Sequence, residues 1–453
     1  MVLVQASNLN LPNPSFLSSS SPHKTTSLLY EPTSHSLALI HSDSSLSLYP
    51  SLSPLSSLST TKTLIPPPSS SSSFLLLHHQ NPNPKVLFLV SSPHRSGSQI
   101  LLKFYVLQKS SKSNGFVRAR VVCSQKGVQI DDKVGVLLDI NHGVCVKLVG
   151  SVNYFALYSL SNAKIWVFAV KLVGGGGGDG DENVVVVKLM RCCVIECCRP
   201  VWEIKISHGL MVLGEENGVR VLNFRQLVKG MVKKVKKLGK GSMLPNGLIG
   251  DYGCGKSASE VACNGYLDGG IDDHSVLVKQ RFVVNGKDSS EGNGCFVAFK
   301  REEADYLKAA KVPLLSVKAI SIEALSPKKF LVLDSFGDLH VLHVPKPLVR
   351  SNLTCHMKQL PLTMKVQKLA FLQDISSRLQ TVWLSDGSYS VHMITLSDMD
   401  TAVNEDDRKE YEETQSSVVL AIFASEKIQD IVPLAANGVL ILGQGSLFAY
   451  AIS

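Results

Sequence analysis

Residues 250–257, GDYGCGKS, match the phosphate-binding pattern G-x-x-x-x-G-K-[ST] at every fixed position. In a loop of this kind the backbone N–H groups surround the phosphates and the lysine side chain contacts them. Downstream, residues 330–334, FLVLD, form an apolar run that ends in an acid, where a magnesium-binding aspartate often stands. Lys256, Ser257 and Asp334 are therefore the first candidates for chemistry.

A phosphate loop needs a buried strand before it and a helix after it. Pro245 and Gly247 leave only two residues for such a strand, and the pair Asn264-Gly265 would end a helix after about two turns. Between the two motifs, one segment, residues 301–311, has the composition of a helix, whereas a nucleotide-binding α/β fold needs several. Asp334 is better explained as the start of a hairpin turn. A P-loop enzyme using residues 250–257 is therefore the alternative function, and not the favoured one.

The second candidate is the cysteine run RCCVIECCRP. In a strand, Cys193 and Cys197 lie on one face and Cys192 and Cys198 on the other, so without a bulge the four cannot converge on a metal ion. We therefore expect core thiols that pack as small hydrophobic groups. The ten cysteines form no regular framework and no secretory signal precedes them, which favours a reducing compartment.

Two polar segments of opposite charge stand out. Residues 404–417 are acidic, and residues 225–241 contain a lysine-rich run that is typical of a nuclear-import signal or of a solvated loop. No aromatic residues are interleaved as stacking platforms, so nucleic acid is not an expected partner. The basic residues of the lysine-rich run are Arg225, Lys229, Lys233, Lys234, Lys236, Lys237 and Lys240.

Two histidines, His340 and His343, stand at i and i+3 of one expected strand and therefore on its opposite faces.

The elements that would hold such residues are short strands, because one unit recurs along the chain. It is an apolar strand, a small polar turn and a second strand that alternates apolar and polar residues. Asn217-Gly218 and Asp386-Gly387 supply the positive φ angles of tight hairpin turns. The copies are residues 37–52, 85–107, 154–170, 210–224, 279–300, 330–344, 381–394 and 439–452.

Their turn centres lie 49 to 71 residues apart, and a four-stranded propeller blade takes about 40–50 residues before insertions. Further strands are expected between the hairpins, at residues 184–190, 201–207, 366–372 and 417–423. The sequence thus predicts an all-β protein, a single β-propeller over residues 1–453 with seven or eight four-stranded blades. We assign two loop insertions, a Gly- and Lys-rich one at residues 226–274 and an acidic one at residues 398–417.

This architecture resembles the β-propellers of the WD40-like kind over nearly the whole chain. The resemblance is one of architecture only, because the Gly-His and Trp-Asp dipeptides of true WD40 repeats are absent, although the segments KIWVFAV and TVWLSD each retain a tryptophan. It implies a rigid ring but no particular activity. A pair of β-sandwiches would explain the hairpins but not their period.

The N-terminus has two interpretations. Residues 1–7, MVLVQAS, could complete the last blade by pairing with the C-terminal strand, which otherwise has no outer neighbour. Alternatively, residues 1–130 hold only two acids, Glu31 and Asp43, against ten Lys and Arg, which is typical of an organelle transit peptide. On that alternative a leader of about 120 residues is removed and a shorter propeller begins near residue 130.

From these patterns we expect a non-enzymatic scaffold whose loops, above all the two insertions, bind a protein partner. We assign no catalytic, cofactor-binding or metal-binding residue and expect no cofactor. No apolar run approaches the about 18 residues of a membrane span, and the net charge of +9 is spread over 453 residues. The expected location is cytoplasm or nucleus, with a chloroplast or other organelle as the alternative. Oligomeric state is not predicted.

Overall fold

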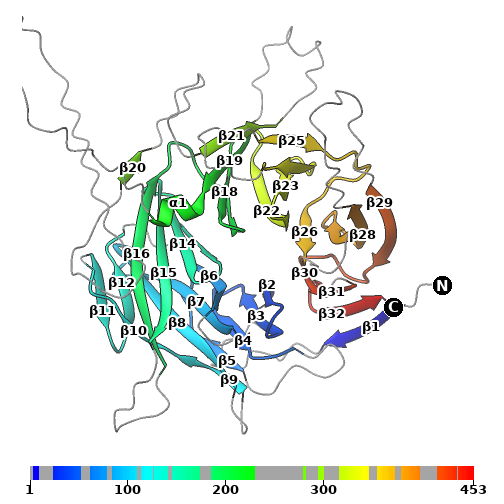
Figure 1. The fold of residues 1–453 in the computed structure, drawn as a ribbon. Coiled ribbons are helices and arrows are strands. Elements are labelled where there is room, and N and C mark those ends of the chain that lie inside the picture. Colours follow the sequence, from blue (N-terminus) through cyan, green and yellow to red (C-terminus); the bar gives the residue numbers. More distant parts are fainter. Residues whose placement is uncertain are drawn as a thin grey trace, which may run out of the picture.

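The computed structural model shows seven small β-sheets arranged around a common axis (Figure 1). Each sheet starts with its innermost strand and runs outward. The described residues are 4–9, 24–52, 62–78, 84–109, 114–125, 127–140, 145–173, 185–229, 279–281, 294–299, 316–345, 355–372, 379–397, 416–435 and 437–452.

Five of the sheets have four antiparallel strands each, and we call each sheet a blade. From the innermost strand outward, blade one is β2 (Thr25–Glu31), β3 (Ser36–His41), β4 (Leu46–Tyr49) and β5 (Thr63–Ile65); blade four is β17 (Glu203–Ser207), β18 (Leu210–Glu215), β19 (Gly218–Asn223) and β21 (Gly294–Ala298); blade five is β22 (Ala319–Ser326), β23 (Lys329–Asp334), β24 (Leu339–His343) and β25 (His356–Gln359); blade six is β26 (Lys368–Phe371), β27 (Leu379–Ser385), β28 (Ser390–Ser397) and β29 (Ser416–Phe423); blade seven is β30 (Asp430–Ala435), β31 (Gly438–Leu442), β32 (Leu447–Ile452) and β1 (Val4–Leu9).

Blades two and three have the same four-strand core, with two added strands each. Blade two is β6 (Ser71–Leu77), β7 (Lys85–His94), β8 (Gln99–Lys109) and β9 (Asn114–Arg118), and the hairpin β11 (Val128–Asp131) and β12 (Gly135–Leu138) extends β8. Blade three is β13 (Val146–Gly150), β14 (Tyr154–Ser159), β15 (Lys164–Val173) and β16 (Val186–Glu196), and β10 (Arg120–Val122) and β20 (Lys279–Arg281) pair with β16 in parallel.

The core is divided among seven hydrophobic clusters, one between each pair of neighbouring blades. This follows from the strand patterns, because a sheet that is apolar on both faces must bury each face against another sheet. Every residue of β18 and of β23 is buried. The innermost strand of each blade also contacts that of the next blade all the way around, including β30 with β2. These contacts define a closed, seven-bladed β-propeller.

The ring is closed by the two ends of the chain. β1 pairs with β32 in antiparallel register, from Val4 opposite Ile452 to Leu9 opposite Leu447. Figure 1 shows β1 as the outermost strand beside the C-terminus. Leu9 is buried in the cluster between blades seven and one. The expected role of the N-terminal segment as the closing strand is confirmed.

Seven of the eight expected hairpins are present as the second and third strands of the seven blades. The hairpin expected at residues 279–300 is wrong. Its first half, β20, pairs with β16 of blade three, while its second half, β21, is the outermost strand of blade four. The two halves therefore belong to different sheets, and the number of blades is seven rather than eight.

The described residues between 25 and 122 form blade one, the four core strands of blade two and β10. The hypothesis of a shorter propeller that begins near residue 130 is wrong for this structure, as is that of paired sandwiches.

No helix of the described residues is long and apolar enough to cross a membrane. The helix α1 (Phe224–Lys229) covers the start of the expected 226–274 insertion, and residues 230–274 and 398–415 lie outside the described part of the chain.

Candidate functional site

The turns between second and third strands all lie on one face of the ring, because the seven blades share one strand order. We call it the hairpin-turn face. Neighbouring strands are antiparallel, so the connections between third and fourth strands lie on the opposite face. Both expected insertions fall between such strands, and the strand ends that flank them, of β19 and β21 and of β28 and β29, lie on that opposite face. The turns are residues 42–45, 95–98, 160–163, 216–217, 335–338, 386–389 and 443–446.

Three aromatic side chains are exposed on the hairpin-turn face of blades five and six. Phe423 is 77% exposed, Tyr389 55% and Phe336 42%. Tyr389 ends the blade-six turn, and Phe423 is the last residue of β29, opposite Ser390. The Ala424 N–H donates to the Tyr389 carbonyl oxygen at 2.8 Å, so Tyr389 and Phe423 are neighbours. We call Phe336, Tyr389 and Phe423 the aromatic surface.

The turn that carries Phe336 is held from beneath by Asp334. Its buried carboxylate accepts hydrogen bonds from the N–H groups of Phe336 and Asp338, each at 2.9 Å, and lies 3.0 Å from His340 Nε2. Burial alone would raise the pKa of Asp334, but the hydrogen bond from His340 and those from the backbone lower it overall. The expected role of Asp334 in a hairpin turn is confirmed.

Backbone geometry adds to the rigidity of these turns. Gly337 has φ +83°, and a Cβ there would lie 2.9 Å from the backbone of Val366, whose N–H donates to the Gly337 carbonyl oxygen. In the blade-six turn the Ser385 hydroxyl accepts from the Gly387 N–H at 3.1 Å, and Ile428 N–H donates to the Ser388 oxygen at 2.8 Å. The aromatic surface is thus presented on pre-formed turns.

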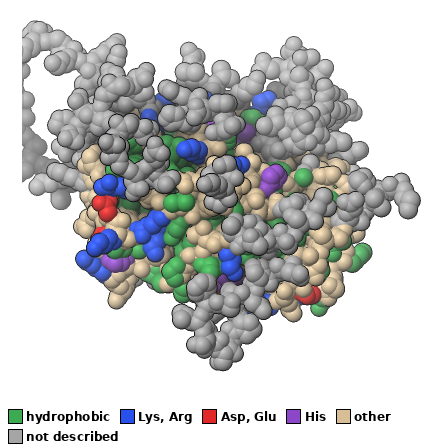
Figure 2. Space-filling model, turned by 90° about the horizontal axis from the view of Figure 1, so that it is seen from below, with side chains coloured by type: hydrophobic (Ala, Val, Ile, Leu, Met, Phe, Trp, Pro, Cys, Tyr) green, Lys and Arg blue, Asp and Glu red, His purple; other side chains and the backbone are tan. Residues whose placement is uncertain are grey.

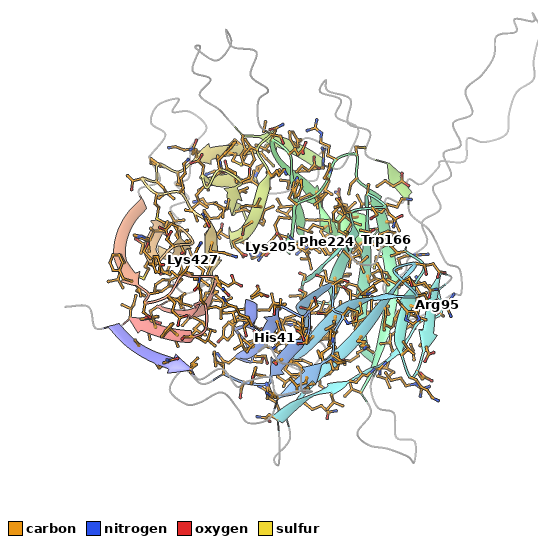
Figure 3. The ribbon with its side chains drawn as sticks, turned by 180° about the vertical axis from the view of Figure 1, so that it is seen from behind. His41, Arg95, Trp166, Lys205, Phe224 and Lys427 are labelled. Carbon is orange, nitrogen blue, oxygen red and sulfur yellow. The ribbon has the colours of Figure 1, made fainter. Side chains whose placement is uncertain are left out.

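The innermost strands carry paired charges that join neighbouring blades. Lys147 of blade three pairs with Glu203 of blade four. Lys205, which Figure 3 places beside the central opening, pairs with Glu323 of blade five at 2.6 Å. Burial raises the pKa of Glu203, and Lys147 offsets part of that increase. Since each charge meets its partner on the neighbouring blade, these pairs hold blades together.

Basic side chains gather on the side of the molecule seen at the left of Figure 2, where the added strands lie. Arg120 of β10 pairs with Asp132 at 3.2 Å, and Arg118, the last residue of the core strand β9, donates to the Lys133 carbonyl oxygen at 2.7 Å. The Arg120 and Asp132 side chains are exposed, so their pair contributes little to stability. These arginines are committed to local contacts, which gives no support for a nucleic-acid interface.

The cysteine run departs in one detail from its expected geometry. The register between β15 and β16 shifts at Val167 and Phe168, which places a β-bulge at Cys192. As a result Cys192, Cys193 and Cys197 all pack against the cluster between blades three and four, whereas Cys198 is exposed. The expected division into two faces is therefore wrong. Burial raises the pKa of Cys192 and of Cys197 to about 12, as expected of core thiols.

No group of three or more metal-ligating side chains is present in the described ranges. His340 is buried against Asp334, and the His343 ring stacks on that of His356 at 4.7 Å. Residues 250–257 and the lysines from 233 to 240 lie outside the described part, so nucleotide binding and nuclear import stay predictions.

The aromatic surface was not predicted from the sequence. The signal that could have indicated it is an aromatic residue within or next to an expected turn.

Comparison with known proteins gives similarity at the level of structure. No family model matches the chain, and no curated protein sequence matches it. The chain is similar to the β-propeller domain of Cps50 (Swd1) from Myceliophteria thermophila, with 9% identity over 98% of this chain and 99% of that one, at a TM-score of 0.43. It is also similar to Sqt1 from Saccharomyces cerevisiae, with 10% identity over 95% and 96% and a TM-score of 0.41.

A third solved structure, the WD40 repeats of RRP9, has 8% identity over 99% of this chain and 97% of that one, with a TM-score of 0.40. Because these sequence identities and TM-scores are low, the seven-bladed assignment rests on the strand pairings and the closed ring of contacts described above. The role of the protein has to be argued from its own surface.

Proposed function

We propose that this protein is a non-enzymatic scaffold that binds a protein partner through the aromatic surface of blades five and six. The observation that carries the proposal is the exposure of Phe423, Tyr389 and Phe336 on one face of two neighbouring blades. Aromatic residues are enriched at the centres of protein interfaces, where burying them supplies much of the binding energy. An exposed group of them indicates an interaction site.

The surroundings of the aromatic surface suit a protein partner. The exposed Lys365 forms an ion pair at 2.5 Å with the half-buried Asp338 of the blade-five turn, and Lys427 is exposed after β29. A polar rim around an apolar centre is the usual composition of a protein interface. The hydrogen-bonded turns also reduce the conformational entropy that binding must remove.

The two insertions are a second contact region in this proposal. The strand ends that flank them lie on the face opposite the aromatic surface, so a scaffold of this form would hold two partners, or two parts of one partner, on opposite sides. Surface loops on a rigid ring vary freely without disturbing the core, which makes them suitable for such contacts. Cytoplasm or nucleus remains the expected location.

Replacing Tyr389 and Phe423 together with serine is expected to reduce capture of the partner at least about tenfold, because two interface aromatics are worth about 1–2 kcal/mol each. Affinity capture from a lysate of the source cells, quantified by mass spectrometry, measures this. Leu160→Ser is the matched control, since Leu160 is 47% exposed on the same face of blade three. A third variant, which tests the insertion, lacks residues 230–274 but retains α1.

The double variant and Leu160→Ser should melt within about 1 °C of the wild type, because exposed substitutions change stability little. Partners lost from the double variant and retained by Leu160→Ser support the aromatic surface. Partners lost only on deletion of residues 230–274 assign binding to the insertion instead. If the double variant captures its partners as well as the wild type does, the proposed surface is contradicted.

A further inference from the structure

Two cysteines that stand far apart in the sequence meet between blades four and five. Cys295 lies on β21, the outermost strand of blade four, opposite Val221 of β19. Val221 is buried in the cluster between the two blades, and directly opposed residues of an antiparallel pair share a face, so Cys295 faces blade five. Cys355 immediately precedes β25 and packs against the same cluster.

Both side chains therefore lie against one cluster, where the Cys355 thiol and backbone N–H are near enough to act on the Cys295 sulfur as hydrogen-bond donors. The outermost strands β21 and β25 contact each other, so the pair joins blades at the outer rim of the ring. Both cysteines are partly exposed, unlike Cys193, which is buried. A small oxidant in solution can therefore reach them.

Their surroundings make the two sulfurs unequal. The hydrogen bonds from Cys355, with a contribution from Arg220, lower the pKa of Cys295 despite its partial burial. The same contact and burial raise the pKa of Cys355. When one of the two thiols loses its proton, these directions favour a Cys295 thiolate that accepts a hydrogen bond from the Cys355 thiol. A thiolate beside a second thiol is the arrangement found in redox-sensing cysteines.

We propose that Cys295 and Cys355 are a peroxide-responsive pair that closes a reversible disulfide between blades four and five. The Cys295 thiolate attacks one oxygen of hydrogen peroxide, which forms an S–O bond, breaks the O–O bond and releases hydroxide that becomes water. The Cys355 sulfur then attacks the Cys295 sulfur, so the S–S bond forms and the S–O bond breaks. The hydroxyl group leaves as water with the proton of Cys355.

In sum, two thiols are oxidised and one peroxide is reduced to two waters. Once Cys295 is a neutral sulfenic acid, the negative charge that held the proton on Cys355 is gone, which favours the second step. A dithiol reductant returns both residues to thiols. The disulfide ties together the outermost strands of two blades, and would thereby limit their separation at the rim.

The test uses the full-length reduced protein, treated with graded hydrogen peroxide at neutral pH, blocked with N-ethylmaleimide and mapped by mass spectrometry without reduction. The expected product is a cross-linked peptide containing Cys295 and Cys355, about 2 Da lighter than its two thiol parts and reversed by dithiothreitol. It should appear at peroxide concentrations that leave Cys193 and Cys197 as thiols.

Two variants separate the roles. In Cys355→Ser the sulfenic acid of Cys295 should persist and be trapped by dimedone, whereas Cys295→Ser should leave Cys355 unlabelled. Cys198→Ser removes an exposed thiol outside the pair and should cross-link as the wild type does. The peptide map of the wild-type protein tests the proposal even if one of the variants misfolds. Oxidation of other thiols with no Cys295–Cys355 peptide would overturn the proposal, as would dimedone labelling of Cys355 in Cys295→Ser.

Discussion

Deletion of residues 1–10 is expected to lower the melting temperature by about 5–10 °C. These residues contain β1, which supplies the outermost strand of blade seven and pairs with β32 over six residues. Each ladder hydrogen bond contributes about 0.5–1.5 kcal/mol, and burial of Leu9 adds to them, so a loss of about 3–6 kcal/mol is expected. The deletion also exposes the edge of β32, which should promote association of chains.

The matched control is deletion of residues 1–3, because β1 begins at Val4 and remains complete. That variant should melt as the wild type does. A synthetic peptide of residues 1–10, added to the longer deletion, should restore the melting temperature in proportion to its concentration. Equal melting of the two deletion variants would show that the N-terminal strand does not close the ring.

Trp383→Ala is expected to reduce the free energy of unfolding by about 3–5 kcal/mol. Trp383 is 1% exposed and packs in the cluster between blades six and seven, where its loss leaves a cavity between two sheets. Among the described residues its indole N–H has no hydrogen-bond partner. Trp383→Phe therefore removes an unsatisfied donor along with some volume, and should lose less than about 1.5 kcal/mol.

Urea unfolding of the three proteins, followed by far-ultraviolet circular dichroism, measures the difference. A propeller of this size need not unfold in one step, so the midpoints of the curves are compared before any free energy is extracted. The expected order of midpoints is wild type, then Trp383→Phe, then Trp383→Ala well below both. An alanine variant that unfolds at the wild-type midpoint would contradict the packing of blades six and seven.

Much of the fold was predictable because it depends on local pattern. An apolar strand, a polar turn and an alternating strand identify a hairpin wherever the turn is short, as between β23 and β24. The pattern failed at residues 279–300, where a long insertion separates β19 from β21. There two short apolar segments looked like one hairpin, although each completes a different sheet.

The closing strand was predictable for a different reason, namely that residues 1–7 form a short alternating apolar segment suited to pairing with β32. The candidate sites were less accessible to sequence reasoning, because they depend on which blades become neighbours. Cys295 and Cys355 contact each other only once blades four and five pack. The bulge at Cys192 likewise depends on the register of β15, which the sequence of β16 does not specify.

The most direct test of the closed ring is a cross-link between its two ends. Ser7 lies opposite Ala449 in the ladder of β1 and β32, so cysteines at these two positions should form a disulfide on mild oxidation. Cysteines at Ser7 and Ala451, two residues out of register, should not. The ring as described predicts a peptide joining positions 7 and 449 in the first variant alone, and a folded protein that yields no such peptide would contradict it.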